Sequence, residues 1–599
     1  MNELDPLNQG QEQQRRLMTG LLVAFALSFV YMYFFPPAQP PQQAAGADAG
    51  TVVDGGTAIA GVTPPTPTPE GSVAPGGSEE PAPPPVTISR ERQWATYAFS
   101  NEGAGLTSAV LKGEKMREQS QVSVTEGYKR LFGGEAKPAP QMNLAQPAPG
   151  QPLPLSISIQ GAAPLPADTR FHVDESANPD KGASFTARRG PWEVTKSFQW
   201  PHEGFELIYT LQVRNVSQQA RTGELQVHYS RAIDPENEHA PSFFGGVGNL
   251  SHAACQVGEE LHKLVPEQSL PEAEALRGPV HFFGIDQQYF LSALYPLEGP
   301  IPGACSFTAT KDVRAVTASF PLTAGPGETV TLRFGGYFGP KDVDFLAPVP
   351  SAELKQATGL TSTYHPPLEQ TIDYGWWAVI AKLLVWVMKR FNAMFGNWGV
   401  AIILLTVLVK LILLPLTHRS MVSMEAMKKL QPRVEEIRKK YAEDRERQNM
   451  EMMRVYQEAK VNPLGGCLPL LIQMPVWIAL FTALRNSYDI YQEPFFGPIW
   501  RDLTYKDPTY LLPLALGVSM VITQRLQPQM GDPMQAKMMT WFVPILFTAT
   551  LFQYPAGLSL YIFTNNLLSI AQQYGLRKWL AHKEATAAPA TAGAGGKRK

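Results

Sequence analysis

The sequence predicts a multi-domain membrane protein, in which an all-α polytopic membrane core with six spans in total is joined to a large all-β sandwich. Two observations predict this fold class. Apolar blocks lie at residues 17–35 and again after residue 375, as expected for helices that cross a bilayer. Between them, short runs alternate apolar and polar residues and are separated by Gly, Pro and Asn, which is the pattern of β-strands. A chain of 599 residues has room for both parts.

The composition argues against several classes of function. The net charge is −2, which gives no basis for nucleic-acid binding. The three cysteines are too few for a disulfide-rich scaffold and form no CxxC or His/Cys pattern of a metal site. The sequence therefore predicts neither a metal nor another cofactor.

Residues 1–35 are predicted to form an N-terminal transmembrane anchor. Arg15 and Arg16 precede an uncharged apolar run over 17–35, and about 20 residues of helix cross a bilayer. The alternative is a secretory signal, whose apolar core is only about 7–15 residues long and ends in small residues, whereas this run ends in Tyr, Phe and Pro. Residues 36–88 are rich in Pro, Gly and Ala and are predicted to be a disordered linker.

Residues 89–370 are predicted to form the β-sandwich, on the side of the membrane opposite the cytoplasm. Segments such as FELIYTLQVRNVS and ETVTLRFGGYFGP alternate apolar and polar residues, and no long helical period interrupts them. Cys255 and Cys305 both lie here, and the sequence leaves open whether they form a disulfide. The region shows no GxSxG, HExxH or phosphate-loop motif, so no catalytic site is predicted.

Residues 371–395 are predicted to form an amphipathic helix that lies along the membrane interface. Their apolar part is short and contains Lys382, and it is followed by Lys389 and Arg390. Tryptophans at its start suit the level of the lipid headgroups. A membrane span is the alternative for this segment.

Residues 396–580 are predicted to form a core of five spans. In order, the candidate spans are Trp398–Thr417, Leu464–Leu484, Tyr510–Leu526, Met538–Gln553 and Leu558–Gln573. Lys and Arg gather in the loop after the first span and in the tail, which places that loop and both chain ends in the cytoplasm. The loop is predicted to form a helical hairpin over 419–461, and residues 581–599 a basic tail. The third and fourth spans are short, which predicts local thinning of the bilayer.

One charged residue, Lys410, lies inside the first of these spans. A bare charge there costs several kcal/mol, roughly 2.5–3.5 on insertion scales. Thr406 lies one turn earlier on the same helix face. The other spans add amides but no Asp or Glu: Gln473, Gln524, Asn565, Asn566 and Gln572. Either Lys410 snorkels toward the cytoplasm, or it lines a water-filled groove that is open to the cytoplasm and awaits an anion brought by a ligand.

Four segments closely resemble one protein family. They are GNWGVAIILLTVLVKLILLPLT at 396–417, NPLGGCLPLLIQMPVWIALF at 462–481, DPMQAKMMTWFVPILF at 532–547 and YPAGLSLYIFTNNLLSIAQQ at 554–573. In this order they resemble the YidC membrane-protein insertases. Residues 1–370 resemble, less distinctively, the N-terminal anchor and periplasmic β-supersandwich of the Gram-negative members.

The resemblance implies an insertase and chaperone of the bacterial inner membrane. Such a protein inserts nascent membrane proteins and helps them fold, alone or with the Sec translocon. It works through a hydrophilic groove that is open to the cytoplasm and to lipid. The hairpin matches the cytoplasmic loop that receives substrate, and the ribosome is a further implied partner through the hairpin and the tail.

The resemblance also implies roles for particular residues. Those of the groove are Lys410, Thr406, Gln524 and Tyr561. Met474 and Trp477 match the apolar slide along which a substrate enters lipid. The family usually has an arginine where this chain has Lys410, and lysine keeps the charge but lacks the fork that binds a carboxylate with two hydrogen bonds.

Two other functions would also explain parts of the sequence. A transporter or channel with a periplasmic binding domain would place polar residues at membrane depth, but many transporters carry internal repeats and none is found here. A membrane-anchored β-sandwich enzyme would require a convergent carboxylate or His pair, which the sequence does not display. Insertion makes and breaks no covalent bond, so the predicted activity is non-hydrolytic and the protein is not predicted to be an enzyme.

Overall fold

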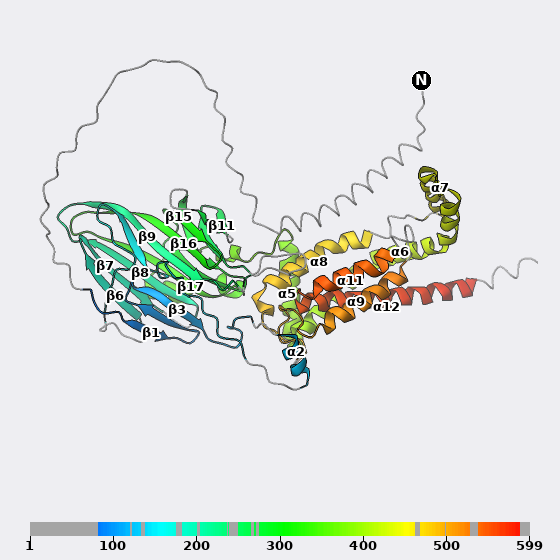
Figure 1. Ribbon diagram of the computed structural model, residues 1–599, viewed down its shortest axis with the longest axis horizontal. Helices are drawn as coiled ribbons and strands as arrows, with labels where there is room; N and C mark the ends of the chain where they lie inside the picture. Colours follow the sequence, from blue (N-terminus) through cyan, green and yellow to red (C-terminus); the bar gives the residue numbers. More distant parts are fainter. Residues whose placement is uncertain are drawn as a thin grey trace, which may run out of the picture.

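The computed structural model describes residues 82–119, 123–132, 138–174, 182–200, 204–235, 238, 250–264, 269–270, 275–459, 461, 468–496, 499–527 and 537–587. The predicted anchor at 1–35, most of the predicted linker at 36–88 and the end of the tail lie outside these residues. The described residues form two bodies that lie end to end, a β-domain and a bundle of helices (Figure 1).

The β-domain is built from antiparallel strands. A three-stranded sheet has the order β1-β2-β3, and a larger sheet runs β4-β9-β16-β15-β13-β14-β17-β8-β7-β6-β5, with β10 to β12 at its side. Its strands are β1 Thr87–Glu91, β2 Ala95–Ser100, β3 Gly105–Leu111, β4 Ile157–Gly161, β5 His172–Val173, β6 Gly182–Arg189, β7 Trp192–Gln199, β8 Glu206–Asn215, β9 Arg221–Ala232, β10 His252–Val257, β11 Glu260–Leu264, β12 Ser269–Leu270, β13 Leu276–Asp286, β14 Phe290–Pro296, β15 Ile301–Ala309, β16 Val313–Ala324 and β17 Thr329–Pro340.

The larger sheet folds back on itself, so that its two halves enclose an aromatic core. Phe320 of β16 packs on Phe334 of β17 with ring centroids 5.8 Å apart, although the strands are far apart in the sheet order. The small sheet covers one side of this core, where the ring centroids of Phe99 of β2 and Phe198 of β7 are 4.6 Å apart. The alternating burial of β2 and β7 gives each strand one buried face. The β-sandwich predicted from the alternating sequence is present.

Cys255 of β10 and Cys305 of β15 form a disulfide, which settles the question that the sequence left open. Both strands pair with β13, at different positions along it. The bond therefore joins two strands that do not neighbour each other in the sheet order.

The helices are α2 Val124–Leu131, α3 Val343–Leu346, α4 Ala352–Thr358, η2 Leu368–Thr371, α5 Ala378–Phe395, α6 Trp398–Lys440, α7 Arg445–Glu458, α8 Leu468–Asn486, η4 Tyr488–Ile490, α9 Leu511–Leu526, η5 Met538–Phe542, α11 Val543–Leu551 and α12 Ala556–Ala587. The sequence predicts no helix near residue 124, and α2 is a short exception of 8 residues. Its two turns are too few for a helical period to be recognised.

Helix α6 is longer than the span predicted within it. Its 43 residues contain Pro415 and Pro432 and continue from the bundle into the first arm of the predicted hairpin. Asp444 caps the second arm, α7, by accepting a hydrogen bond from the Arg447 backbone N–H at 2.9 Å. The predicted span and the predicted hairpin are therefore connected by one uninterrupted helix.

The outer face of the bundle is apolar. Among the described residues, α6 is the one helix whose length and apolar composition suffice to cross a membrane, and two shorter apolar helices are Leu511–Leu526 and Met538–Leu551. Large apolar side chains on these three helices point outward and are exposed: Leu411, Ile412, Leu514, Val518, Ile522 and Ile545. An exposed apolar surface of this extent is what contact with lipid requires.

A cluster of charges joins the two bodies. Lys389 of α5 lies 2.9 Å from Asp344 of α3, 3.0 Å from Asp489 of η4 and 3.6 Å from Asp342. Burial opposes the charge of Lys389, but the carboxylates outweigh it and raise the lysine pKa. The β-domain, helix α5 and the bundle therefore meet at the Lys389 ammonium.

Candidate functional site

Helix α12 carries a line of polar side chains through the bundle. Gln473 of α8 donates to Asn565 Oδ1 at 2.7 Å, and Asn566 donates to Ser519 Oγ of α9 at 3.1 Å. Since α8 and α9 contact α12 through these amides, polar groups hold the helices together at their centre. Side-chain hydrogen bonds between helices are a common way to join spans inside a membrane.

Lys410 joins α6 to the same line. The residue is only 7% exposed, and its ammonium Nζ donates to Ser569 Oγ of α12 at 2.8 Å. Ser569 in turn donates to the Asn565 carbonyl oxygen at 2.8 Å. No carboxylate within the described ranges lies within ion-pair distance of Lys410. Its one recorded partner is a neutral hydroxyl, which does not neutralise the charge.

Thr406 and Tyr561 are buried, and each precedes, on its own helix, the residue that makes this contact. Thr406 lies one turn before Lys410 and donates to the Ile402 carbonyl of its own helix at 2.7 Å. Tyr561 lies two turns before Ser569 on α12, and its hydroxyl has no hydrogen-bond partner in the described part of the chain. Because residues four apart share a helix face, both residues continue the faces that meet at Lys410 and Ser569.

Gln524 lies near the end of α9. It is half-buried in the last turn of this helix, two residues before Leu526, whose carbonyl accepts a hydrogen bond from Arg577 of α12 at 2.6 Å. Ser519, five residues before Gln524, contacts Asn566 of α12. Gln524 therefore lies on the part of α9 that runs beside α12 between Asn566 and Arg577.

Met474 and Trp477 lie on α8 next to the polar line. Both are half-buried, and the adjacent Gln473 bonds to Asn565. The Trp477 ring stacks on Phe481 with centroids 6.4 Å apart. The predicted slide therefore begins at the level of the polar residues and continues along an apolar, partly exposed helix face.

The sequence reasoning did not identify Ser569 or Ser519, which contact Lys410 and Asn566. A signal was present, because Ser569 lies four residues after Asn565 and eight after Tyr561, on one face of α12. Serine is common in helices that cross membranes, however, so this spacing did not distinguish Ser569 from other serines.

The predicted hairpin is connected to the bundle by an ion pair. Arg577 of α12 lies 2.6 Å from Glu425 of α6. Both side chains are partly shielded from solvent. The pair fixes the start of the hairpin beside the part of α12 that follows the polar line.

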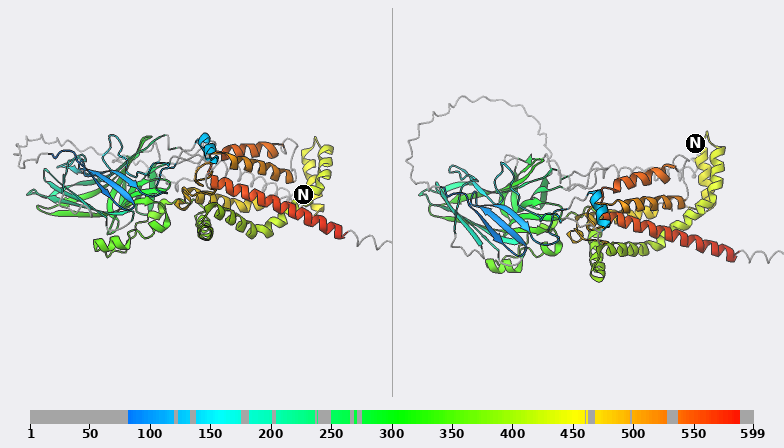
Figure 2. Two further views of the ribbon diagram at one scale, coloured as in Figure 1. Left: turned by 90° about the horizontal axis from the view of Figure 1, so that it is seen from below. Right: turned by 60° about the horizontal axis from the view of Figure 1, so that its bottom comes forward.

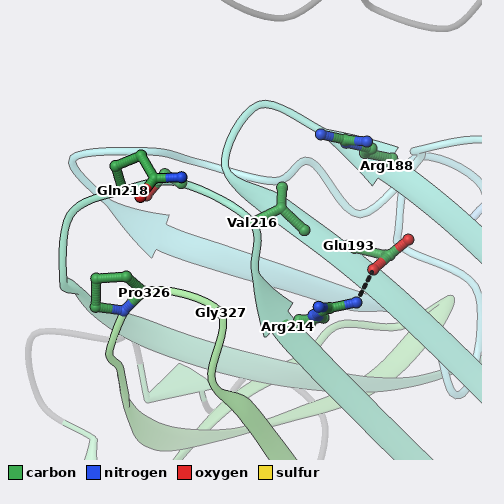
Figure 3. Close-up of a pocket in the computed structure, with 8 residues that line it drawn as sticks. Arg188, Glu193, Arg214, Val216, Gln218, Pro326 and Gly327 are labelled. Atoms are coloured by element: carbon green, nitrogen blue, oxygen red, sulfur yellow. Dashed lines mark ion pairs between the residues drawn. The ribbon is translucent and has the colours of Figure 1, made fainter.

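Two other features have some of the properties of a binding site, a cavity in the β-domain and a carboxylate cluster at the junction. A cavity of about 440 Å³ lies by the turns that follow β6 and β8 in the β-domain (Figure 3). Arg214 and Glu193 pair across it at 3.6 Å, and its lining contains no histidine: Arg188, Glu193, Arg214, Val216, Ser217, Gln218, Pro326 and Gly327.

Three carboxylates at the junction are close enough to hold a metal ion, Asp342, Asp344 and Asp489, but the Lys389 ammonium already lies among them.

Known proteins match both bodies of this chain. A family model described as 60Kd inner membrane protein matches residues 390–584, and one described as YidC periplasmic domain matches residues 133–387. A relative named membrane protein insertase YidC, from Anaeromyxobacter sp. (strain Fw109-5), is 38% identical over 488 residues, which cover 79% of this chain and 81% of the relative. A relative of the same name from Geobacter metallireducens is 33% identical over 585 residues, which cover 96% of this chain and 100% of the relative.

A solved structure, described as an active YidC insertase with its first transmembrane domain resolved, is 20% identical. The match covers 83% of this chain and 95% of that chain, with a TM-score of 0.35. Because this score is low, the structural match carries no weight beside the sequence matches.

Proposed function

The chain belongs to the YidC family of membrane protein insertases, and from this premise we propose how its helical bundle inserts a substrate. The protein acts on nascent membrane proteins in the inner membrane, with its β-domain in the periplasm. The proposed path is a groove that begins at the cytoplasmic ends of α6, α9 and α12 and reaches Lys410.

Lys410 is the proposed attraction point for the leading tail of a substrate. An ammonium has three N–H donors, and the described contacts of Lys410 use one of them, on Ser569. A carboxylate carried by the substrate can therefore bind without displacing an existing ion pair. The direction of Nζ toward α12 favours the groove over a snorkelling lysine, whose ammonium would point along α6 to the cytoplasm.

The short helices reduce the distance that the substrate tail must cross. Helix α9 has 16 residues, about 24 Å of helix, which is less than the roughly 30 Å of hydrocarbon in a bilayer. The apolar helices around it expose large side chains to lipid. We propose that the bilayer thins beside α9 and α11, which lowers the cost of moving a short polar tail.

The apolar segment of the substrate then leaves along Met474 and Trp477. Each Å² of apolar surface that moves from water into lipid contributes about 25 cal/mol, so a single hydrophobic segment supplies the driving force. No covalent bond is made or broken in this sequence of steps. The mechanism requires no nucleotide, metal or other cofactor.

The proposal also includes the membrane topology of the chain. Six spans, with the N- and C-termini in the cytoplasm, put the hairpin and the open end of the groove on the side where substrates are made. The domain boundaries are those expected from the sequence, with the anchor at 1–35, the β-domain at 89–370, the interfacial helix at 371–395 and the core at 396–580. The Sec translocon and, through the hairpin and the tail, the ribosome are the proposed partners.

The contact between Lys410 and Ser569, with no neighbouring carboxylate, is the observation that carries this proposal. The test is insertion of a single-span substrate, with an acidic or a neutral tail, into vesicles that contain the full chain. We expect Lys410→Gln and Lys410→Ala to lose about tenfold or more of the insertion of the acidic-tail substrate only, and Lys410→Arg to keep it. Lys382→Gln, which removes an exposed lysine of α5, is the matched control. Equal insertion of both substrates by every variant would show that Lys410 does not act on substrate charge.

A further inference from the structure

We propose that α2, together with the adjacent Phe132, is a second membrane contact of the β-domain, which inserts its apolar face into the lipid headgroup region beside α9. The interfacial helix expected at 371–395 is a different segment. This inference concerns the position of the β-domain on the bilayer and does not depend on the groove.

The proposed contact is a stripe of three apolar residues that the protein leaves exposed. Val124 and Tyr128 are four residues apart and share one face of α2, and Phe132, which directly follows the helix, continues this spacing. Their exposed fractions are 38%, 41% and 88%. A phenylalanine exposed to this extent in a chain with a large β-sandwich core is unexpected in water, but it is common where an amphipathic helix lies in a membrane interface.

The position of α2 identifies what covers the stripe. The Tyr128 hydroxyl donates to the Thr509 carbonyl oxygen at 3.0 Å, and Thr509 lies two residues before the apolar helix α9 begins at Leu511. Leu511 and Leu514, in the first turn of α9, are exposed as well. The exposed apolar residues at the start of α9 therefore lie close to α2, at the end of the bundle nearest the β-domain (Figure 1).

The backbone of α2 approaches the bundle closely because residue 127 is a glycine. A Cβ atom at Gly127 would lie 2.8 Å from Pro508 Cβ and 2.9 Å from the Pro508 carbonyl oxygen. Any other residue would push α2 away from the start of α9. The glycine thus holds the apolar stripe at the depth where the span enters the bilayer.

The charges of α2 also suit a bilayer surface. The helix sequence VTEGYKRL contains one acidic and two basic residues. Lys129, which follows Tyr128, is exposed and can reach lipid phosphates. Attraction to an anionic surface adds about 1 kcal/mol for each basic residue near it.

The two membrane contacts lie on different flanks of the bundle. Helix α5 exposes Val379, Leu383 and Trp386, and Trp376 is exposed just before the helix begins. Figure 2 shows α2, drawn in blue, and the lime-coloured α5 on opposite sides of the bundle. A domain held at one flank can tilt about that point. Contact at both flanks fixes the orientation of the β-domain on the membrane.

The test measures lipid contact directly on the full chain. A Cys467→Ser background leaves only the Cys255–Cys305 disulfide, so a single new cysteine can be labelled with an environment-sensitive fluorophore. Phe132→Cys and Val124→Cys report on the stripe. Val86→Cys, which is exposed to a similar degree as Val124 and lies next to β1, away from the bundle (Figure 1), is the control.

Each labelled protein is placed in vesicles of phosphatidylethanolamine and phosphatidylglycerol that carry a nitroxide on the lipid near the headgroup. We expect the lipid nitroxide to quench the label at 132 and at 124 at least threefold more than the label at 86. Equal quenching at all three sites would overturn the proposal. A label at 132 that neither lipid nitroxide nor a water-soluble nitroxide can quench would also overturn it, because a protein surface would then cover the stripe.

Discussion

The β-domain buries Lys196 and the helical bundle buries Lys410, and these two lysines are held in opposite ways. Lys196 of β7 is fully buried and donates to three backbone carbonyls, those of Gly103, Ala104 and Leu155, at 2.7–2.8 Å. Lys410 of α6 donates to one neutral hydroxyl. An ammonium has three donors, so Lys196 is saturated and Lys410 is not. The first lysine is built to hold a structure, and the second retains the capacity to bind something else.

The surroundings of Lys196 support a structural role. The three carbonyls belong to segments that precede β3 and β4, so the lysine ties both to β7. Rings of Phe171, Phe198 and Tyr209 lie 5.6–5.8 Å from Nζ and stabilise a cation through their faces. Burial lowers the pKa of Lys196 well below its usual value, but three short contacts with carbonyl oxygens require the three donors of the charged form.

The largest effect is expected for Lys196→Met. The substitution leaves three buried carbonyls without a donor, which we expect to destabilise the β-domain by about 3–5 kcal/mol. Thermal unfolding of the full chain in detergent, followed by near-UV circular dichroism, measures this loss. Lys382→Met, at an exposed position, is the control and should unfold as the parent does. If the Lys196→Met protein were as stable as the parent, Lys196 would lack the structural role that distinguishes it from Lys410.

The second effect is a loss of β-domain stability in mild acid. Burial, with a smaller contribution from Lys196, lowers the pKa of His228 to about 4. The folded ring therefore stays neutral while the unfolded ring, with a pKa near 6.5, binds a proton. The stability is complete above about pH 6.5 and falls as the pH drops toward 4, by about 2 kcal/mol for this residue at pH 5.

His228→Gln is the variant that isolates this contribution. His228 contacts Ser158 Oγ at 2.9 Å and Thr317 Oγ1 at 3.1 Å, and glutamine can bond to at least one of these hydroxyls without titrating. Urea unfolding at pH 7 and pH 5 should show a smaller acid loss in the variant. His252, whose pKa burial also lowers to about 4, contributes to the part that remains. An unchanged acid loss in His228→Gln would assign the whole effect to other groups.

The sequence predicts the broad features of this molecule because they follow from periodicity and hydropathy. The predicted span Tyr510–Leu526 corresponds to helix Leu511–Leu526, since a long apolar run between polar loops has few other interpretations. The continuity of α6 through Pro415 and Pro432 was not predictable, because proline usually ends or bends a helix.

Contacts between distant segments were also beyond the sequence. Lys410 and Ser569 are 159 residues apart, and nothing in either segment marks them as neighbours. The same holds for Tyr128 and Thr509, which are 381 residues apart. Residue types in the apolar segments predict a polar groove, whereas the pairing of the polar residues depends on how the helices pack.

The third effect concerns Lys389 of α5, whose ammonium lies between the β-domain and the helical bundle. Unlike Lys196 and Lys410, it has carboxylate partners, but it is partly exposed and so is Asp344. Lys389→Met removes the charge that separates Asp342 from Asp489, and we expect a loss of about 1–2 kcal/mol at the junction. Limited proteolysis between the β-domain and α5 should become several-fold faster. Arg390→Met, one residue along α5, is the control, and equal proteolysis of both variants would show that the junction does not depend on the ion pairs.

The smallest effect on stability is expected for Lys410→Met. This variant gives the sharpest test of the difference between Lys410 and Lys196. Among the described residues, Lys410 has one recorded partner, the neutral Ser569 hydroxyl, and methionine fills a similar volume without a charge to desolvate. We expect its thermal stability in detergent to stay within about 1 kcal/mol of the parent or to rise, while the insertion of an acidic-tail substrate is lost. Lys196→Met should show the reverse, with a less stable β-domain and a functioning groove in the molecules that remain folded. A large loss of stability in Lys410→Met would mean that the lysine holds the bundle together, so that its role would resemble that of Lys196.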